Sequence, residues 1–198
     1  LYGKLSDIYG RRLLYVIAMA LFLTGSMLCG LAQSMTQLIA SRALQGLGAG
    51  GIQPLAFILI GEIFTLKQRA KMQGFFSGVW GVSSIAGPLL GGFLVDQLSW
   101  RWIFYINLLP GLLAVALVAL VWRDHVNSHE RPAVDYVGAA LLTSSVVSLL
   151  LGLMDFGTSN SWTLIAVAVA LFIALLWVER RAADPSLPLH LFRERLFA

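Results

Sequence analysis

The sequence is poor in charged residues and in cysteine. Asp, Glu, Lys and Arg make up only 12% of its 198 residues, whereas a soluble domain usually carries about 25%. Hydrophobic residues make up 58%, and the mean hydropathy is +0.80. The single cysteine, Cys29, lies in an apolar run and excludes a disulfide framework. This composition excludes an ordinary soluble domain and indicates a protein of the lipid bilayer.

Histidine is also scarce, and its three copies lie in polar connectors. His125 and His129 are four residues apart beside Asp124 and Glu130, and histidines at this spacing on a helix can share a metal ion. Pro132 interrupts the segment, which has no helical pattern, so we expect no metal there. Clustered His, Asp, Glu or Cys at a membrane face, which a membrane-embedded enzyme needs, is missing as well. We therefore expect no catalytic residues, no metal and no cofactor.

Long apolar runs fill most of the chain. Because they do not alternate with a period of two, and because backbone groups in hydrocarbon must be satisfied within the segment, we expect helices. About 20 apolar residues suffice to cross a bilayer. Six spans are predicted, at about 13–32, 37–60, 72–95, 102–122, 136–156 and 162–178.

Basic residues define the orientation of these spans. The formal net charge of +4 comes from short basic clusters between apolar runs, so no nucleic-acid partner is expected. Alternate connectors contain twelve of the fourteen basic residues, while the opposite connectors contain only Arg101. The basic connectors, which we place on the cytoplasmic side, contain Lys4, Arg11, Arg12, Lys67, Arg69, Lys71, Arg123, Arg131, Arg180, Arg181, Arg193 and Arg195.

The stretch from Gly3 to Arg12 is the most charged part of the first thirty residues. Its two glycines predict a tight connection, because glycine tolerates positive φ. Asp7 is expected just before the next helix, where a carboxylate faces the positive end of the helix dipole. From these residues alone, the stretch is an ordinary basic loop between two membrane helices.

The same stretch resembles the loop signature between the second and third helices of the major facilitator superfamily, G-x-L-a-D-r-x-G-r-k. The positions that match are Gly3, Leu5, Asp7, Gly10, Arg11 and Arg12. Ile8 departs from the pattern, since the family usually has a basic residue there. The resemblance implies a role at the inner gate of a transporter for Gly3, Asp7, Gly10, Arg11 and Arg12.

Arg42 lies inside the second span, where an arginine costs at least about 2.5 kcal/mol and normally faces a cavity or a partner. Gln45 lies three residues on, on the same helix face. One interpretation is snorkelling to the nearby outer end of the helix, and the other is a buried polar cluster. The segment resembles the superfamily's fourth-helix signature at Arg42, Gln45, Gly46 and Gly48, and the resemblance implies a role in proton coupling for Arg42.

The run from Gly46 to Gly51 formally matches the dinucleotide-binding pattern G-x-G-x-x-G. That site requires a strand before the glycines and a helix after them, whereas these lie within a membrane span. Close packing of helices in lipid explains them better.

The third span carries small residues at intervals of three and four, which predicts a small-residue groove along one face. Pro88 is expected to kink this helix. The run Gly87, Pro88, Gly91 and Gly92 resembles the fifth-helix signature g-x-x-x-G-P-x-x-G-G, with Ser83 in place of the first glycine. In the superfamily this signature is associated with antiporters, so the resemblance implies export in exchange for protons.

The run from Trp100 to Asn107, with Pro110 and Gly111 after it, resembles the sixth helix of the fourteen-helix drug:proton antiporters. Pro110 comes three residues after the asparagine, not two as is common there, so the kink is expected to be displaced. Asp96 and Arg101 are placed to pair at this outer turn, although an exposed pair contributes little. Lining residues of a drug cavity are expected to be apolar and aromatic, and the candidates, which packing explains equally well, are Phe57, Phe75, Phe76 and Trp80.

The sequence therefore predicts an all-α integral membrane protein with six transmembrane helices, matching helices 3–8 of a fourteen-helix major facilitator. Residues 1–122 are assigned to the N-terminal bundle, residues 123–178 to a cytoplasmic loop and two extra helices, and residues 179–198 to a connector. The chain begins at Leu1 and ends as another apolar segment starts, so we expect an internal fragment.

The predicted function is proton-driven export of lipophilic or cationic drugs, or similar small molecules, across the inner or plasma membrane. Substrate, protons and the bilayer are the expected partners, and the proton gradient is the energy source. The oligomeric state is open, with a monomer as one option. An importer or facilitator of the same fold is the first alternative, and a membrane-embedded enzyme is a less favoured one.

Overall fold

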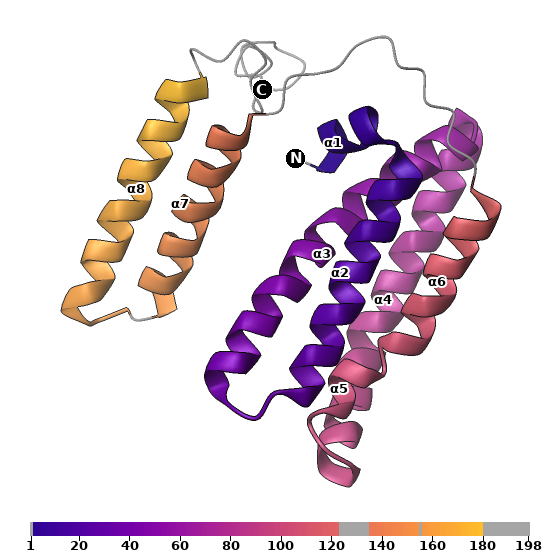
Figure 1. Ribbon diagram of the computed structural model, residues 1–198, viewed down its shortest axis with the longest axis horizontal. Helices are drawn as coiled ribbons and strands as arrows, with labels where there is room; N and C mark the ends of the chain where they lie inside the picture. The colour runs from indigo at the N-terminus through magenta and orange to yellow at the C-terminus, as the bar shows by residue number, and fades with distance from the viewer. Residues whose placement is uncertain (1, 123–134, 155, 180–198) are drawn as a thin grey trace. The chain divides into compact units, whose positions relative to one another are not determined.

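The computed structural model describes residues 2–122, 135–154 and 156–179, and within these ranges it contains helices and no strands (Figure 1). All six predicted spans are confirmed as helices long and apolar enough to cross a membrane. They cover Arg11–Leu31, Met35–Ile63, Leu66–Gln97, Trp102–Val121, Tyr136–Met154 and Asn160–Glu179. The segments 123–134 and 180–198, which include the candidate metal residues His125 and His129 and the predicted connector, lie outside the described residues.

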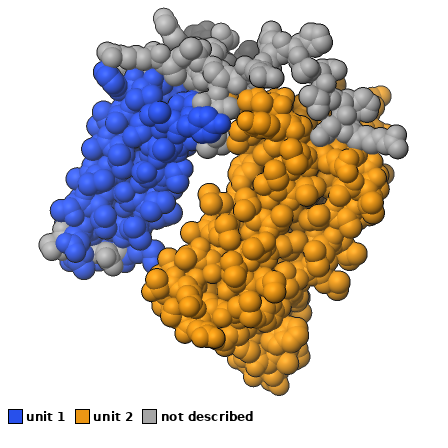
Figure 2. All heavy atoms as spheres, viewed as in Figure 1, with its two compact units in different colours: residues 1, 130–198 blue, residues 2–129 orange. Residues whose placement is uncertain are grey.

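The chain forms two compact units, residues 2–129 and residues 130–198 with Leu1 (Figure 2). We call them the bundle unit and the hairpin unit. The bundle unit contains helices α1 (Tyr2–Tyr9), α2 (Arg11–Leu31), α3 (Met35–Ile63), α4 (Leu66–Gln97), α5 (Trp102–Tyr105) and α6 (Leu108–Val121). The hairpin unit contains α7 (Tyr136–Met154) and α8 (Ser159–Glu179). The predicted domain boundaries stay predictions.

Helix α2 is the centre of the bundle unit. It packs most extensively against α3 and also contacts α1, α5 and α6. Leu14, Ala18 and Leu55 form a buried core cluster between α2 and α3. Small residues permit this closeness: a Cβ added at Gly48 would lie 2.4 Å from the backbone nitrogen of Phe22. Van der Waals packing of small residues is the main way in which helices associate in lipid.

Helix α4 begins at Leu66, six residues before the predicted start of its span. A capping box explains the difference, because the Thr65 side chain and Gln68 satisfy each other's backbone groups at the helix start. The first six residues of α4 are not recognised by hydropathy, because this part of the helix contains the basic cluster of Lys67, Arg69 and Lys71.

The fourth span is interrupted near its start. Helix α5 ends at Tyr105 and α6 begins at Leu108, with Ile106 and Asn107 between them. Pro110 explains the position of the break, because a proline ring clashes with the carbonyl group four residues earlier, here that of Ile106. The distortion thus lies before the proline, within the span that the sequence predicts as one helix.

The hairpin unit is a pair of packed helices. The Ser145 hydroxyl of α7 donates a hydrogen bond of 2.8 Å to the Ala168 carbonyl oxygen of α8, and both residues are buried. Gly157 provides the turn between the helices with a φ of 104°, a conformation that side chains other than glycine's disfavour. At the other end, the Asp135 carboxylate caps α7 by accepting a 2.7 Å hydrogen bond from the Gly138 N–H group.

Candidate functional site

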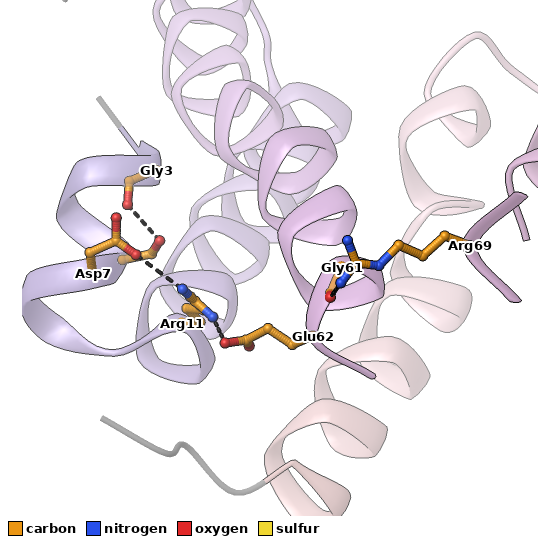
Figure 3. A network of polar contacts seen from close by, with 7 residues as sticks. Gly3, Asp7, Arg11, Gly61, Glu62 and Arg69 are labelled. Carbon is orange, nitrogen blue, oxygen red and sulfur yellow. Dashed lines mark hydrogen bonds and ion pairs between the residues drawn. The ribbon is translucent and has the colours of Figure 1, made fainter. Parts of the chain in front are cut away.

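The first polar site lies where α1, α2 and α3 meet at the basic end of the bundle unit (Figure 3). The predicted loop over this stretch is wrong, because Tyr2–Tyr9 forms helix α1. Asp7 lies within α1 and pairs with Arg11, the first residue of α2, at 3.3 Å between Oδ1 and Nη2. Asp7 therefore lies one turn before α2 and pairs with its first residue, while Gly10 occupies the N-cap position.

Gly10 is the hinge between the two helices. Its φ is 94° and it occupies the N-cap position of α2 without a side-chain cap. Only glycine adopts this conformation without strain, so the prediction of a required glycine is confirmed for Gly10. Gly3 instead lies in α1, and a Cβ there would make an ordinary 3.8 Å contact with Ile58.

Arg11 also forms an ion pair with Glu62, in the last turn of α3 (Figure 3). Arg11 thereby links the carboxylates of Asp7 and Glu62 across three helices. The side chains are 30% exposed for Arg11 and 37% for Glu62, so the pair is partly solvated, and we expect its contribution to folding stability to be modest. We call Asp7, Arg11 and Glu62 the basic-end triad.

Two further arginines bind backbone carbonyl oxygens at this end. Arg12 donates from Nη2 to the Ala119 carbonyl oxygen in the last turn of α6. Arg69, near the start of α4, donates to the carbonyl oxygens of Gly61 and Phe64 at the end of α3. Arginine at a helix C-terminus also complements the negative end of the helix dipole. The basic residues of the bundle unit thus hold one end of α2, α3, α4 and α6 together.

The second polar site surrounds Arg42 in the outer half of α3. The Arg42 guanidinium donates a hydrogen bond of 3.0 Å to Oε1 of Gln45 and lies 5.7 Å from the ring centroid of Phe104 in α5. Gln45 is buried at 4% exposure, and its Oε1 also lies 3.8 Å from the Cys29 thiol of α2. Arg42 and Gln45 share a face, as their spacing predicts. Arg42 therefore has a polar and an aromatic partner, while its side chain is exposed among the described residues. Both interpretations, snorkelling and the polar cluster, stay open.

The glycines of α3 divide between two faces. Gly48 and Gly51 face α2 and α1, where an added Cβ would lie within 2.6 Å of neighbouring atoms. At Gly46 and Gly50 an added Cβ would meet nothing within 4 Å among the described residues. The prediction of close packing is therefore confirmed for Gly48 and Gly51, while the side of Gly46 is open.

A groove of about 560 Å³ lies between α3 and α4. Two aromatic rings in it, Phe57 of α3 and Phe76 of α4, have centroids 6.4 Å apart at an interplanar angle of 49°. Of the four aromatic residues predicted as liners, Phe57, Phe76 and Trp80 line this groove and Phe75 does not. Among the described residues, this open groove is lined by Gln53, Phe57, Gln73, Phe76, Ser77 and Trp80.

A second groove of about 420 Å³ lies between α2, α3 and α6. Its walls are mostly apolar, and Asn107 at the α5–α6 break is one of its polar residues. Gln53 lines this groove as well as the first. Both grooves therefore share one amide side chain on α3.

The glycine-rich face of α4 has no neighbour among the described residues. A Cβ added at Gly87, Gly91 or Gly92 would meet nothing within 4 Å, and no residue of α4 is buried. Pro88 lies inside this helix. These small residues of α4 are therefore unpacked among the described residues, and the small-residue groove stays a prediction.

At the outer end, Arg101 does not pair with Asp96 as we expected. Its Nη2 donates a 3.0 Å hydrogen bond to the Ala32 carbonyl oxygen, and its guanidinium lies 4.7 Å from the ring centroid of Trp100. The Ser26 hydroxyl adds a 2.8 Å hydrogen bond to the Phe104 carbonyl oxygen. Arg101 thus helps to fasten the outer end of α2 to α5.

Sequence reasoning missed Glu62 and Gln53. Glu62 is the one acidic residue between Asp7 and Asp96, and its place at the end of a span beside a basic connector was a usable signal. Gln53 is an uncharged polar residue next to Pro54 within an apolar span, a weaker signal because membrane helices tolerate amides.

Comparison of the sequence with known proteins identifies the family of this chain. Residues 1–176 match the family model of the Major Facilitator Superfamily. The chain is 41% identical to multidrug resistance protein 3 of Bacillus subtilis, an alignment that covers 100% of this chain and 40% of that protein. It is 42% identical to the multidrug transporter protein MdtP of the same organism, covering 98% of this chain and 37% of that protein.

A fungal relative shows the same partial coverage. The MFS-type efflux transporter ffsH of Aspergillus flavipes is 37% identical over 98% of this chain and 37% of its own length. The chain therefore spans about two fifths of the length of these relatives. With six apolar helices, this chain belongs to the Major Facilitator Superfamily and is a multi-pass protein of the plasma membrane.

Proposed function

We propose that this chain is part of a transporter that exports lipophilic or cationic drugs, or similar small molecules, in exchange for protons. Transporters of this architecture rock two helical bundles around a site near the membrane midplane. The proposal needs no catalytic residue and no cofactor, because the proton gradient supplies the energy. Small-molecule substrate, protons and the bilayer are its partners.

The observation that carries the proposal is the position of Arg42. Its guanidinium lies within a membrane helix and is hydrogen-bonded at 3.0 Å to the buried Gln45. A positive charge lowers the pKa of a nearby carboxyl group and favours its deprotonation. The resemblance to the family implies a proton-carrying carboxylate in the first helix of the full transporter. Arg42 would assist proton release from that carboxylate.

Two further features support export. Gly87 and Pro88 lie within helix α4, and the resemblance of this run to the superfamily's antiporter signature favours export. The aromatic groove between α3 and α4 suits lipophilic solutes. The relatives named for multidrug resistance and multidrug transport support the same substrate class.

The test uses the full-length protein that contains these residues, reconstituted in proteoliposomes. A pH gradient is imposed, and movement of a neutral lipophilic fluorophore and of the lipophilic cation ethidium is followed for the wild type, Arg42→Ala and Arg42→Lys. The matched control is Arg101→Ala, since Arg101 binds a backbone carbonyl group at the outer end of the same unit. We expect gradient-driven efflux in the wild type and the control, and its loss in Arg42→Ala.

The outcomes separate the alternatives. Efflux that survives Arg42→Ala in a folded protein would remove Arg42 from proton coupling and leave it a packing or snorkelling role. Gradient-driven movement in the opposite direction would identify an importer of the same fold. Retention of efflux in Arg42→Lys, with loss in Arg42→Ala, would show that the positive charge suffices without the bidentate geometry of arginine.

A further inference from the structure

Gln53 holds a position that the proposed function does not yet use. It lies ten residues before the end of α3 at Ile63, or about 15 Å along the helix axis at 1.5 Å per residue. This distance is about half of a hydrocarbon core of roughly 30 Å. Its side chain is exposed and lines both grooves of the bundle unit. An amide at this depth is costly unless it finds a polar partner.

The backbone beside Gln53 adds hydrogen-bonding capacity. Pro54 follows within the helix and has no N–H group to donate to the Gly50 carbonyl oxygen four residues earlier. Gly50 and Gln53 share a face at i, i+3, and no described atom lies within 4 Å of a Cβ added at Gly50. The open face of α3 therefore presents the Gln53 amide beside a carbonyl group that lacks its usual helical donor.

Aromatic surfaces flank this amide. Phe57 lies four residues beyond Gln53 on the same face, and its ring is 6.4 Å from that of Phe76 on α4. Trp80 and a second amide, Gln73, complete much of the wall on α4. Flat rings stack well on such surfaces, while amides provide both donors and acceptors.

Charge is missing from this lining. Among the described residues that line either groove, none is Asp, Glu, Lys or Arg. Burying a cation without a counter-charge is far more expensive than burying a neutral polar group that gains a hydrogen bond. The grooves are therefore suited to neutral aromatic solutes that carry a hydrogen-bond donor and acceptor.

We propose that Gln53 is the specificity-determining residue of this half of the transporter, and that it selects flat, neutral aromatic solutes carrying a hydrogen-bond donor and acceptor over quaternary aromatic cations. The inference rests on the proposed function and narrows its substrate class. Solute hydrogen bonds form with the Gln53 amide while the solute's rings pack against the aromatic wall of Phe57, Phe76 and Trp80.

The experiment measures binding to the purified full-length protein in detergent, without any gradient. Two three-ring probes of nearly equal shape are compared by equilibrium dialysis at pH 8: acridone, which is neutral and has an N–H and a C=O group, and 10-methylacridinium, which is cationic and has no donor. The variants are Gln53→Leu and Gln53→Glu, with Gln97→Leu as the matched control, because Gln97 is an exposed amide of α4 outside both grooves.

We expect the wild type to bind acridone more tightly than 10-methylacridinium. Gln53→Leu should weaken acridone binding about threefold to tenfold, as loss of one hydrogen bond implies, and leave 10-methylacridinium within about twofold. Gln53→Glu should raise affinity for 10-methylacridinium by adding the missing counter-charge. Gln97→Leu should change neither probe.

Equal weakening of both probes in Gln53→Leu would overturn the proposal, because it would indicate a packing role. Tighter binding of 10-methylacridinium than of acridone by the wild type would overturn it as well, whatever the variants do. Selective binding that depends on Gln53, without any pH-driven efflux in proteoliposomes, would support this inference while refuting the proposed function.

Discussion

The sharpest test of the fold compares two glycines of the same helix. Gly46 and Gly48 are two residues apart in α3 and lie on different faces. A Cβ at Gly48 would lie 2.4 Å from the Phe22 nitrogen and 2.5 Å from the Ala18 carbonyl oxygen, both backbone atoms of α2. A Cβ at Gly46 would meet nothing within 4 Å among the described residues. We expect Gly48→Ala to destabilise the protein and Gly46→Ala to leave it unchanged or slightly stabilised.

The magnitude follows from the geometry. Ordinary contacts of a Cβ begin at about 3.4 Å, so α2 and α3 must separate by roughly 1 Å to accept the methyl group at Gly48. Inserting a methyl group into a packed interface typically costs about 1–3 kcal/mol. Both substitutions gain the same helix propensity, roughly 0.5–1 kcal/mol. Because this gain cancels between them, the difference in the free energy of unfolding should be about 1–3 kcal/mol.

The assay is thermal unfolding of the full-length protein in one detergent, followed by tryptophan fluorescence and by the fraction that remains monodisperse after heating. Gly25→Ala tests the opposite side of the same contact, since its Cβ would lie 2.5 Å from the Gln45 nitrogen, and it should lower Tm as Gly48→Ala does. Equal Tm values for Gly48→Ala and Gly46→Ala would refute the close packing of α2 on α3 described above.

Three further predictions concern the basic end and the α5–α6 break. Exchanging the charges of the basic-end pair, Arg11→Glu with Glu62→Arg, should fail to restore wild-type stability in thermal unfolding, because the carboxylate introduced at position 11 would then repel Asp7 at i, i+4; full restoration would refute the triad. Desolvation raises the pKa of Tyr2 above 10.0, so its stabilising contribution is full below pH 10 and is lost as the pH rises through that raised pKa. Tyr2→Phe should flatten the alkaline loss of stability, and an unchanged pH profile would contradict this. Pro110→Ala should restore a hydrogen-bonded helix across the α5–α6 break, seen as slowed amide exchange there; unchanged exchange would assign the break to other residues.

The spans were predictable because they depend on local composition, while their orientation in the membrane stays a prediction. Twenty apolar residues in a row leave few structural choices in lipid, and basic clusters mark one end of each helix whatever the packing. The C-terminal end of α3 is an example, because Arg69 binds the Phe64 carbonyl oxygen there and Arg11 pairs with Glu62. Helix α1 was missed because the short mixture of polar and apolar residues between Gly3 and Gly10 satisfies the pattern of a loop as well as that of a short helix.

Partners across helices were not predictable, because they depend on rotation about each helix axis. The ion pair between Arg11 and Glu62 joins residues 51 positions apart. A rotation of α3 about its own axis would break this pair. Arg42 and Gln45 were found together only because both lie on one helix. The contacts of Arg101 illustrate the same limit, since its partner is a backbone carbonyl oxygen of Ala32, and any residue type supplies such an acceptor.

The two faces of α3 explain why glycine, proline and glutamine occur together in this helix. One face carries Gln45, Gly48 and Gly51 against α2 and α1, where close approach fixes the helix in the bundle unit. The other carries Gly46, Gly50 and Gln53, where small residues leave room and an amide faces a groove. Packing alone would fill the second face with large apolar side chains, since these are cheaper in lipid than an unpartnered amide. Among the described residues, the open face of α3 is therefore the one that our proposal assigns to a solute.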